Sequence, residues 1–215
     1  MIGAPEEGAA TDAECAGRRP GRPRSVEADQ AILEAALDEY ALRGIDGMSM
    51  AAVAARAGCG KATVYRRYPS KVELILAALR GVADEVAPPV DTGTLRGDLL
   101  ALARNLARLV AVGDFAAVMA QAVADAQCDE RLAAVWRPFV IERRAQGVAA
   151  VERAIARGEL PTETDAGYVV DLVAAPIIYR RLWLGLASDD AFVALHVDAV
   201  LDGIVGNTVP TGAPA

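Results

Sequence analysis

Basic and hydroxyl side chains recur between residues 61 and 71, at a spacing that can place them on one surface. Five of them fall within one short stretch: Lys61, Thr63, Tyr65, Arg66 and Arg67. Lys71 follows Ser70, which can cap a helix, so its charge adds to backbone N–H groups that favour an anion there. Such side chains bind phosphates and the edges of bases. The segment therefore predicts contact with nucleic acid, although an ordinary helical hairpin with polar surface residues has the same composition.

The charge of the chain is segregated, which supports this interpretation. The net charge is −7, an unfavourable value for a nucleic-acid-binding protein. However, residues 16–80 carry 11 Lys and Arg against 7 Asp and Glu, whereas residues 81–215 carry 11 against 18. A basic segment in an otherwise acidic chain is the electrostatic pattern of a nucleic-acid-binding module.

Two short helices joined by a glycine turn are expected around the basic cluster, over residues 50–57 and 61–67. Ala54 is small enough for two helices to cross closely, and Gly58 can adopt the positive φ that ends the first helix. Val64 is expected to face inward and hold the crossing angle. This spacing is typical of a helix-turn-helix, the motif that inserts its second helix into the major groove.

The rest of the sequence predicts an all-α protein. Ser25 can cap a helix that Gly44 ends, Ser70 can cap a helix of residues 71–87, and Pro88-Pro89 break that pattern. Further helices are expected over residues 94–112, 114–127, 129–157, 163–187 and 189–206. No alternation of apolar and polar residues typical of strands occurs.

The residue types also exclude several classes of protein. His196 is the only histidine, which excludes a multi-histidine metal site. Cys15, Cys59 and Cys128 are far apart, which argues against a disulfide framework or a cysteine zinc site and fits a reducing compartment. Cys59, between two glycines, is either a redox-sensitive thiol or ordinary turn packing. Without a glycine-rich phosphate loop or a Glu-x-x-His motif, we expect no enzyme, no cofactor and no metal.

The sequence shows neither a signal peptide nor a membrane span. The first 15 residues are acidic and lack an apolar core segment, unlike a secretory signal. Charged residues or proline interrupt every apolar run before it reaches the length of a transmembrane helix. We therefore expect a cytoplasmic protein that does not bind a membrane.

A specific set of residues occurs within residues 26–80: Ile32-Leu33-Glu34-Ala35-Ala36-Leu37, Gly44, Ser49, Val53-Ala54, Ala57-Gly58, Thr63-Val64-Tyr65, Tyr68 and Ser70-Lys71. This set resembles the DNA-binding domain of the tetracycline-repressor (TetR) family. A second set resembles the C-terminal domain of many actinobacterial members: Arg157-Gly158-Glu159-Leu160-Pro161, Asp165, Asp171, Pro176, Tyr179-Arg180 and Gly185. Arg67 departs from the family pattern, because many members have histidine at this position.

The resemblance implies a homodimeric transcriptional regulator, most often a repressor, that leaves a palindromic DNA operator when a small-molecule effector binds. It implies that Thr63 and Tyr65 touch DNA, that Ser49 and Lys71 contact phosphate, and that Tyr68 packs at the end of the recognition helix and can reach phosphate. The guanine contact is left open among three residues: Lys61, Arg66 and Arg67. The rival interpretations are an architectural DNA-binding protein without an effector, and an enzyme.

The chain is expected to divide into four parts. We expect a flexible arm over residues 1–25, a three-helix DNA-binding domain over 26–71, a helical effector-binding and dimerisation domain over 72–207, and a disordered tail over 208–215. Four arginines lie among Pro and Gly in residues 18–24. They either enter a minor groove or belong to a solvated tail.

Aromatic and thioether side chains of the C-terminal region are the candidates for an effector cavity: Phe115, Met119, Trp136, Phe139, Tyr168, Tyr179 and Trp183. Each of them can equally be ordinary core. Arg180-Arg181 indicate either an anionic ligand group or salt bridges with Asp171 or Glu152.

The last two helices are expected to form the dimer. One apolar stripe of the final helix contains Val193, Val197, Val200 and Ile204, while Leu195, Leu201 and Val205 point elsewhere. A helix that is apolar on more than one face needs a second partner, unless it fills the core of a large monomer.

Overall fold

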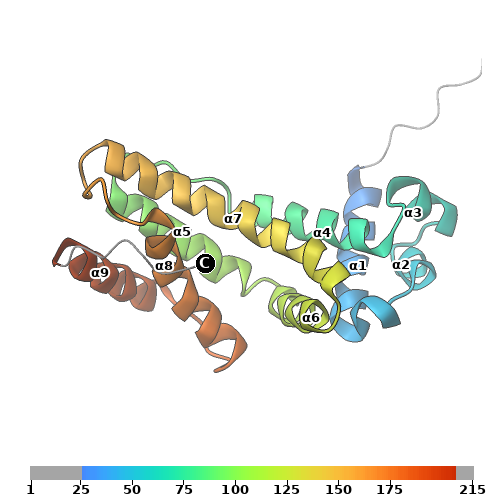
Figure 1. The fold of residues 1–215 in the computed structure, drawn as a ribbon. Coiled ribbons are helices and arrows are strands. Elements are labelled where there is room, and N and C mark those ends of the chain that lie inside the picture. Colours follow the sequence, from blue (N-terminus) through green and yellow to red (C-terminus); the bar gives the residue numbers. More distant parts are fainter. Residues whose placement is uncertain (1–25, 207–215) are drawn as a thin grey trace, which may run out of the picture.

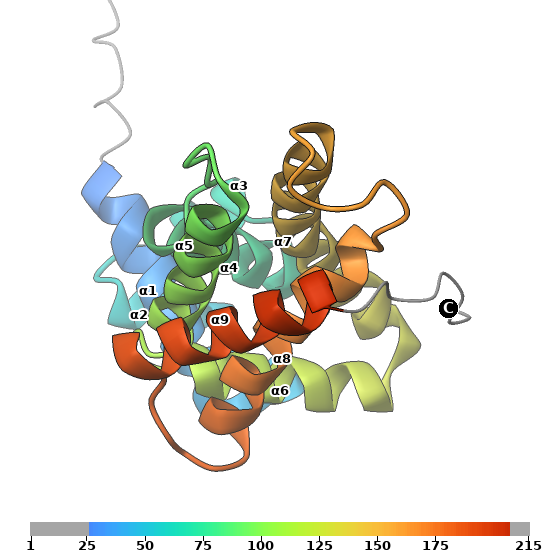
Figure 2. The same ribbon diagram turned by 90° about the vertical axis from the view of Figure 1, so that its left-hand side faces the viewer.

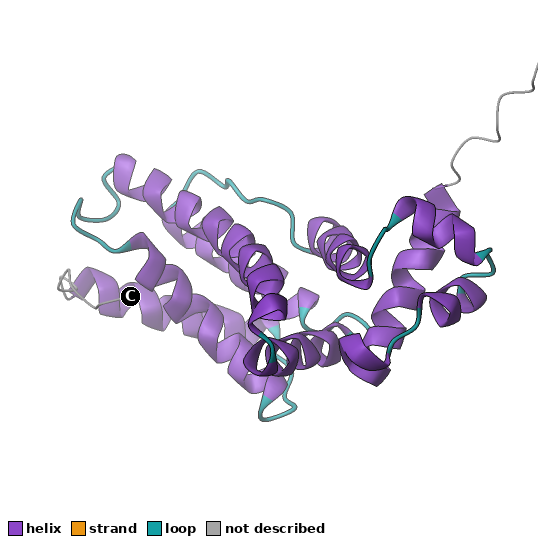
Figure 3. Cartoon of the chain, turned by 45° about the vertical axis from the view of Figure 1, so that its right-hand side comes forward, coloured by secondary structure: helices purple, strands orange, loops and turns teal. Residues whose placement is uncertain are grey.

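Only helices and connecting loops occur in the part of this computed structural model that is described, residues 26–206 (Figure 3). The helices are α1 (Val26–Gly47), α2 (Met50–Arg56), α3 (Lys61–Arg67), α4 (Lys71–Val86), α5 (Leu95–Leu109), α6 (Phe115–Cys128), α7 (Glu130–Ala156), α8 (Ala166–Leu182) and α9 (Asp190–Gly206). This confirms the predicted all-α fold. The expected arginine arm, the Ser25 cap and the expected tail lie outside the described residues.

The helices form an elongated body. Helices α1, α2 and α3 lie at one end, α5, α8 and α9 lie toward the other, and α7 runs along much of the length between them (Figure 1). Seen from the α9 end, α9 crosses α5 and α8, the two helices against which it packs (Figure 2). The two ends are therefore connected mainly through α4, α6 and α7.

Glycine at position 44 breaks α1 as the sequence predicts. Its φ of 64° and ψ of −177° lie in a region that favours glycine, and a last turn then continues to Gly47. A Cβ atom at Gly44 would lie 2.8 Å from Nε2 of Gln121, a side chain of α6. Gly44 is thus favoured by its backbone conformation, while a larger residue would also require the flexible Gln121 side chain to move.

Polar side chains define several helix ends. The hydroxyl oxygens of Ser49, Ser70 and Thr94 accept hydrogen bonds from backbone N–H groups in the first turns of α2, α4 and α5. The predicted helix of residues 163–187 is wrong at both ends. Asp165 caps α8 by accepting a hydrogen bond from the Tyr168 N–H, so α8 begins at Ala166. The helix ends at Leu182, and Gly185 follows with a positive φ of 67°.

Two hydrophobic cores hold the helices together. The first core combines side chains of α1–α4 with α6 and the start of α7, and its members include Ile32, Tyr40, Val64, Leu74, Val118, Trp136 and Phe139. The second core combines α5, the end of α7, α8 and α9, and its members include Leu99, Val151, Val169, Ile177, Val193 and Val197. Helix α4, assigned from the sequence to the C-terminal part, therefore packs in one core with α1.

A polar contact inside the first core joins α1 to α6. The Tyr40 side chain is fully buried, and its hydroxyl donates a hydrogen bond of 2.7 Å to Oδ2 of Asp125. Burial, and then the hydrogen bond to Asp125, raise the pKa of Tyr40, so the phenol stays protonated and acts as a donor. Asp125 also lies 3.4 Å from the Ile45 N–H and 2.9 Å from Nε2 of Gln121.

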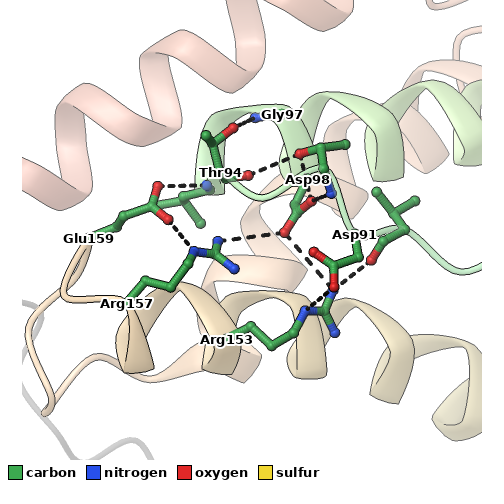
Figure 4. A network of polar contacts seen from close by, with 10 residues as sticks. Asp91, Thr94, Gly97, Asp98, Arg153, Arg157 and Glu159 are labelled. Atoms are coloured by element: carbon green, nitrogen blue, oxygen red, sulfur yellow. Dashed lines mark hydrogen bonds and ion pairs between the residues drawn. The ribbon is translucent and has the colours of Figure 1, made fainter.

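A buried carboxylate organises the start of α5. Asp98 is completely buried, and its Oδ1 accepts hydrogen bonds from the backbone N–H (2.6 Å) and the hydroxyl (2.7 Å) of Thr92 (Figure 4). Its Oδ2 lies 3.9 Å from Nη2 of Arg153 and 3.8 Å from Nη2 of Arg157, both on or next to the end of α7. Two guanidinium groups therefore neutralise a charge that would be costly to bury alone.

A second carboxylate completes this contact. Glu159 accepts a hydrogen bond of 2.7 Å from the Leu95 N–H at the start of α5 and one of 2.7 Å from Nε of Arg157 (Figure 4). The Leu95 N–H and then Arg157 lower the pKa of Glu159. The segment predicted to mark the C-terminal domain thus ties the α7–α8 loop to α5.

The predicted apolar stripe of the last helix is confirmed. Val193, Val197, Val200 and Ile204 of α9 are buried in the second core. Leu195 points elsewhere as predicted, since 72% of its surface is exposed. Leu201 is partly buried against the same core, and the side chain of Val205 lies outside what the structure describes.

Candidate nucleic-acid interface and effector region

Helices α2 and α3 form the predicted helix-turn-helix. Val53, Ala54 and Val64 are buried where the two helices cross, and Gly58 has the positive φ of 64° that the turn requires. The Cys59 N–H closes the turn with a 3.0 Å hydrogen bond to the Ala54 carbonyl oxygen. Buried apolar contacts thus fix α3 relative to α2 and leave the opposite side of α3 in solvent.

The exposed side of α3 carries unpaired positive charge. Lys61 and Arg66 are exposed, and neither has a carboxylate partner among residues 26–206. The Lys61 ammonium lies 5.6 Å from the centre of the Tyr65 ring, which is itself 45% exposed. Thr63 is half-buried beside them. Four of the side chains predicted at this surface therefore lie together on one short helix.

Arg67 is placed differently from Arg66. Its Nη1 lies 2.8 Å from Oδ1 of Asp29 on α1, and only 15% of the side chain is exposed. Tyr68, the C-cap of α3, is half-buried next to this pair. Burial, and then the Asp29 charge, raise the pKa of Tyr68, while Arg67 opposes the shift. Arg67 therefore joins α3 to α1, and a base contact would require it to leave Asp29.

A shallow hollow of about 400 Å³ lies beside α3, between the starts of α2 and α4. Ser49, Lys61, Tyr65, Ser70 and Lys71 all line it. Ser49 is exposed, and its hydroxyl proton is free because its oxygen acts as the cap acceptor. The structure thus brings the two capped helix starts, which favour anions, next to the cationic side of α3.

Lys71 has a structural contact that the sequence did not predict. Its ammonium donates hydrogen bonds of 3.0 Å and 3.3 Å to the carbonyl oxygens of Ile45 and Asp46 at the end of α1. An ammonium has three donors, so one remains for a phosphate. Lys71 consequently fixes the end of α1 against α4 at the edge of the hollow.

The aromatic candidates for an effector cavity do not come together. Phe115, Trp136 and Phe139 are buried in the first core, against which Met119 packs. Tyr168, Tyr179 and Trp183 are 45%, 54% and 70% exposed on α8 and at its end. The seven candidates therefore divide into a buried set in the first core and an exposed set on α8 and at its end.

The two arginines at the end of α8 do not form the predicted salt bridges. Asp171 pairs instead with Arg144, at 2.8 Å. Nη2 of Arg180 donates to the Ala187 carbonyl oxygen, and Nε of Arg181 donates to the Val110 carbonyl oxygen. The prediction of salt bridges with Asp171 or Glu152 is therefore wrong, since both arginines bind backbone carbonyls near the ends of helices.

The remaining reactive side chains show no assembled site within residues 26–206. Nε2 of His196 lies 3.1 Å from the Leu172 carbonyl oxygen, and its ring stacks on Phe192. No group of three or more metal-ligating side chains occurs among the described residues. None of the described helices is long and apolar enough to cross a membrane.

The sequence predicts neither Asp29 as the partner of Arg67 nor Asp125 as the partner of Tyr40. Each pair joins residues that are distant along the chain, and no local spacing signals such a contact. Only the acidic character of the start of α1 hinted that a basic residue lies close to it.

Known protein families match both parts of the chain. Residues 32–78 match the family described as "Bacterial regulatory proteins, tetR family", and residues 89–200 match "Tetracyclin repressor-like, C-terminal domain". The HTH-type transcriptional regulator YdeS of Bacillus subtilis is 33% identical over 86% of this chain and 92% of its own length. The DNA-binding transcriptional repressor TetR of Mycobacteroides abscessus is 36% identical over 80% of this chain and 90% of its own length.

Solved structures agree with this assignment. The crystal structure of the TetR family transcription regulator SCO0332 matches with a TM-score of 0.64 and 29% sequence identity, over 83% of this chain and 98% of that protein. The helix-turn-helix, the C-terminal helical domain and the relatives all point to one conclusion. The chain belongs to the TetR family of bacterial transcriptional regulators.

Proposed function

We propose that this regulator acts in the cytoplasm as a homodimeric repressor, binds a palindromic operator through α3 of each subunit, and is released by a small-molecule effector. The main support for DNA binding is the exposed side of α3, where Lys61 and Arg66 have no carboxylate partner among the described residues. When a two-fold symmetric dimer binds DNA, its two recognition helices enter successive major grooves about 34–36 Å apart. Ser49, Ser70 and Lys71 then face the phosphates on either side of α3.

Arg66 is the side chain we assign to the guanine contact. Arg67 is held by Asp29 at 2.8 Å, and Lys61 lies against the Tyr65 ring. Arg66 is exposed and unpaired among residues 26–206, so its guanidinium can form two parallel hydrogen bonds with a guanine without first breaking an ion pair. Thr63 and Tyr65 supply the neighbouring contacts on the same helix.

Helices α8 and α9 are assigned to the dimer contact. Trp183, Leu186 and Leu195 are 70%, 46% and 72% exposed. They lie at the end of α8, in the α8–α9 loop and on α9, and exposed large apolar side chains are a feature of interaction surfaces. The family relation makes a second copy of the chain the partner we assign to it.

The experiment is operator binding by two adjacent variants. Binding of the wild-type protein to fragments of the DNA upstream of its gene, in about 200 mM salt, first locates the operator. Arg66→Gln is expected to weaken operator binding by about 1–3 kcal/mol and to relax the preference at one base pair. Arg67→Gln serves as the matched control, with the same change of charge one residue away, and is expected to keep the sequence preference. If Arg67→Gln relaxes the preference and Arg66→Gln does not, the assignment of the base contact is wrong.

A further inference from the structure

A cavity of about 430 Å³ lies between the C-terminal half of α5 and the start of α9. This volume is within the range of small-molecule sites. Its apolar lining comes from Ala101, Ala107, Ala111 and Val193 and contains no aromatic side chain. None of the seven aromatic and thioether candidates lines it. The lining thus suits a compact aliphatic group rather than a flat aromatic one.

The polar lining of this cavity carries a net positive charge. Arg104 is neutralised by Asp190, whose Oδ1 lies 3.1 Å from Nε of Arg104. Arg108 has no carboxylate partner among the described residues, and its guanidinium donates only to the side-chain oxygen of Asn105, a neutral group. Arg108 is therefore the uncompensated charge of the cavity, and it favours an anion.

Two further polar groups of the lining are buried. Asn105 is only 7% exposed. The Ser188 hydroxyl oxygen is buried and has no hydrogen-bond partner among the described residues. A buried hydroxyl without a partner is unfavourable, and a polar atom of a ligand would satisfy it. The cavity thus offers an aliphatic wall, an unpaired guanidinium and an unsatisfied hydroxyl.

We propose that this cavity is the effector site of the regulator and binds a small organic anion, a carboxylate on a compact aliphatic body, with Arg108 as its anchor. The guanidinium and the carboxylate form a charge-assisted pair of hydrogen bonds, and Ser188 binds a second polar atom. This inference rests on the proposed function, because it names the chemical class of the effector that the function requires.

The cavity is connected to the DNA-binding end through Asn105. Its Nδ2 donates a hydrogen bond of 3.0 Å to the Pro88 carbonyl oxygen, two residues after the end of α4. The other end of α4 carries Ser70 and Lys71 beside α3. A carboxylate that binds Arg108 shares the guanidinium with the Asn105 oxygen and so lies next to the side chain that holds Pro88. The ligand then changes operator affinity to the extent that it binds the two conformations differently.

The test is isothermal titration calorimetry of the full-length protein at about pH 7.5 with linear and branched monocarboxylates of about four to six carbons. The 1-alkanols of the same lengths are the uncharged comparison. We expect at least one carboxylate to bind about tenfold or more tightly than its alkanol, because carboxylates are ionised at this pH and the alkanols are neutral. Arg108→Gln is expected to remove about tenfold or more of the affinity for the carboxylate.

Arg96→Gln is the matched control. Arg96 also joins α5 to α9, through Asp198 at 2.9 Å, but it does not line the cavity. This variant is expected to bind the carboxylate as the wild type does. Ser188→Ala, which removes only the buried hydroxyl oxygen, provides a second variant and is expected to bind a few-fold more weakly. Circular dichroism melting curves verify that each variant is folded.

Operator binding provides the second readout. The saturating carboxylate is expected to weaken operator binding of the wild type at least about fivefold, and the Arg108→Gln variant is expected to need about tenfold or more carboxylate for the same effect. Absence of carboxylate binding, equal binding by Arg108→Gln, or binding without any change in operator affinity would each overturn the inference. Because the operator is first bound without ligand, failure of DNA binding itself is recognised separately as failure of the proposed function.

Discussion

Removal of the hydrogen bond between Tyr40 and Asp125 measures how much this contact between α1 and α6 contributes to the stability of the protein. Tyr40→Phe keeps the ring, so no cavity forms, and removes only the hydroxyl that donates to Asp125 at 2.7 Å. Oδ2 of Asp125 is then left with the longer 3.4 Å contact to the Ile45 N–H. Water cannot replace the hydroxyl, because the Tyr40 side chain is fully buried.

The expected cost follows from the charge of the acceptor. A hydrogen bond to a charged group contributes about 1.5–3 kcal/mol. For a protein of this size, a loss of about 1 kcal/mol lowers Tm by about 2–4 °C, so Tyr40→Phe is expected to lower it by about 3–12 °C. Urea unfolding followed by circular dichroism at about pH 7, at one fixed protein concentration, measures the free energy of unfolding.

Tyr168→Phe is the matched control for this measurement. Tyr168 is 45% exposed, and among the described residues its hydroxyl has no hydrogen-bond partner. The free energy of unfolding of the Tyr168→Phe protein is expected to stay within about 0.5 kcal/mol of the wild-type value. A Tyr40→Phe protein as stable as the Tyr168→Phe protein would show that the α1–α6 hydrogen bond adds nothing to stability, and the reasoning would be refuted.

Three further predictions concern the C-terminal helices. Asp98→Asn replaces the fully buried charge that faces two arginines and is expected to cost about 1–3 kcal/mol in urea unfolding; an unchanged midpoint would contradict this. Glu159 has a lowered pKa in the folded protein, so it stabilises the fold above its unfolded pKa, and this contribution is lost as the pH falls through the folded value. Glu159→Gln is therefore expected to flatten the decline in Tm between about pH 5 and pH 3, and an unaltered pH profile would count against it. Leu195→Glu is expected to convert the dimer to monomers, as measured by light scattering. Leu42→Glu changes an equally exposed leucine (69%) on α1 and is expected to leave the dimer intact. Dissociation of both variants, or of neither, would argue against the α8–α9 contact.

The sequence by itself determined the local elements of the DNA-binding part. The bounds of α3, the caps at Ser49 and Ser70, and the glycine turn at Gly58 agree with the structure. Each of these features depends on interactions within a few residues: a hydroxyl that caps the next turn, a backbone angle that only glycine adopts freely, or a fixed spacing of small and apolar residues. The apolar stripe of α9 was predictable for the same reason, since helical periodicity alone places it.

Only the tertiary structure shows the features that depend on contacts between side chains of different helices. Arg66 and Arg67 are identical in type and adjacent, but successive residues on a helix point about 100° apart, so one faces solvent and the other reaches Asp29 on α1. The aromatic candidates are divided between a core and an exposed surface because α6 packs on α1, whereas α8 packs mainly on α7 and α5. The cavity at Arg108 combines α5 with the start of α9, far apart along the chain, and it exists only because these helices pack together in space.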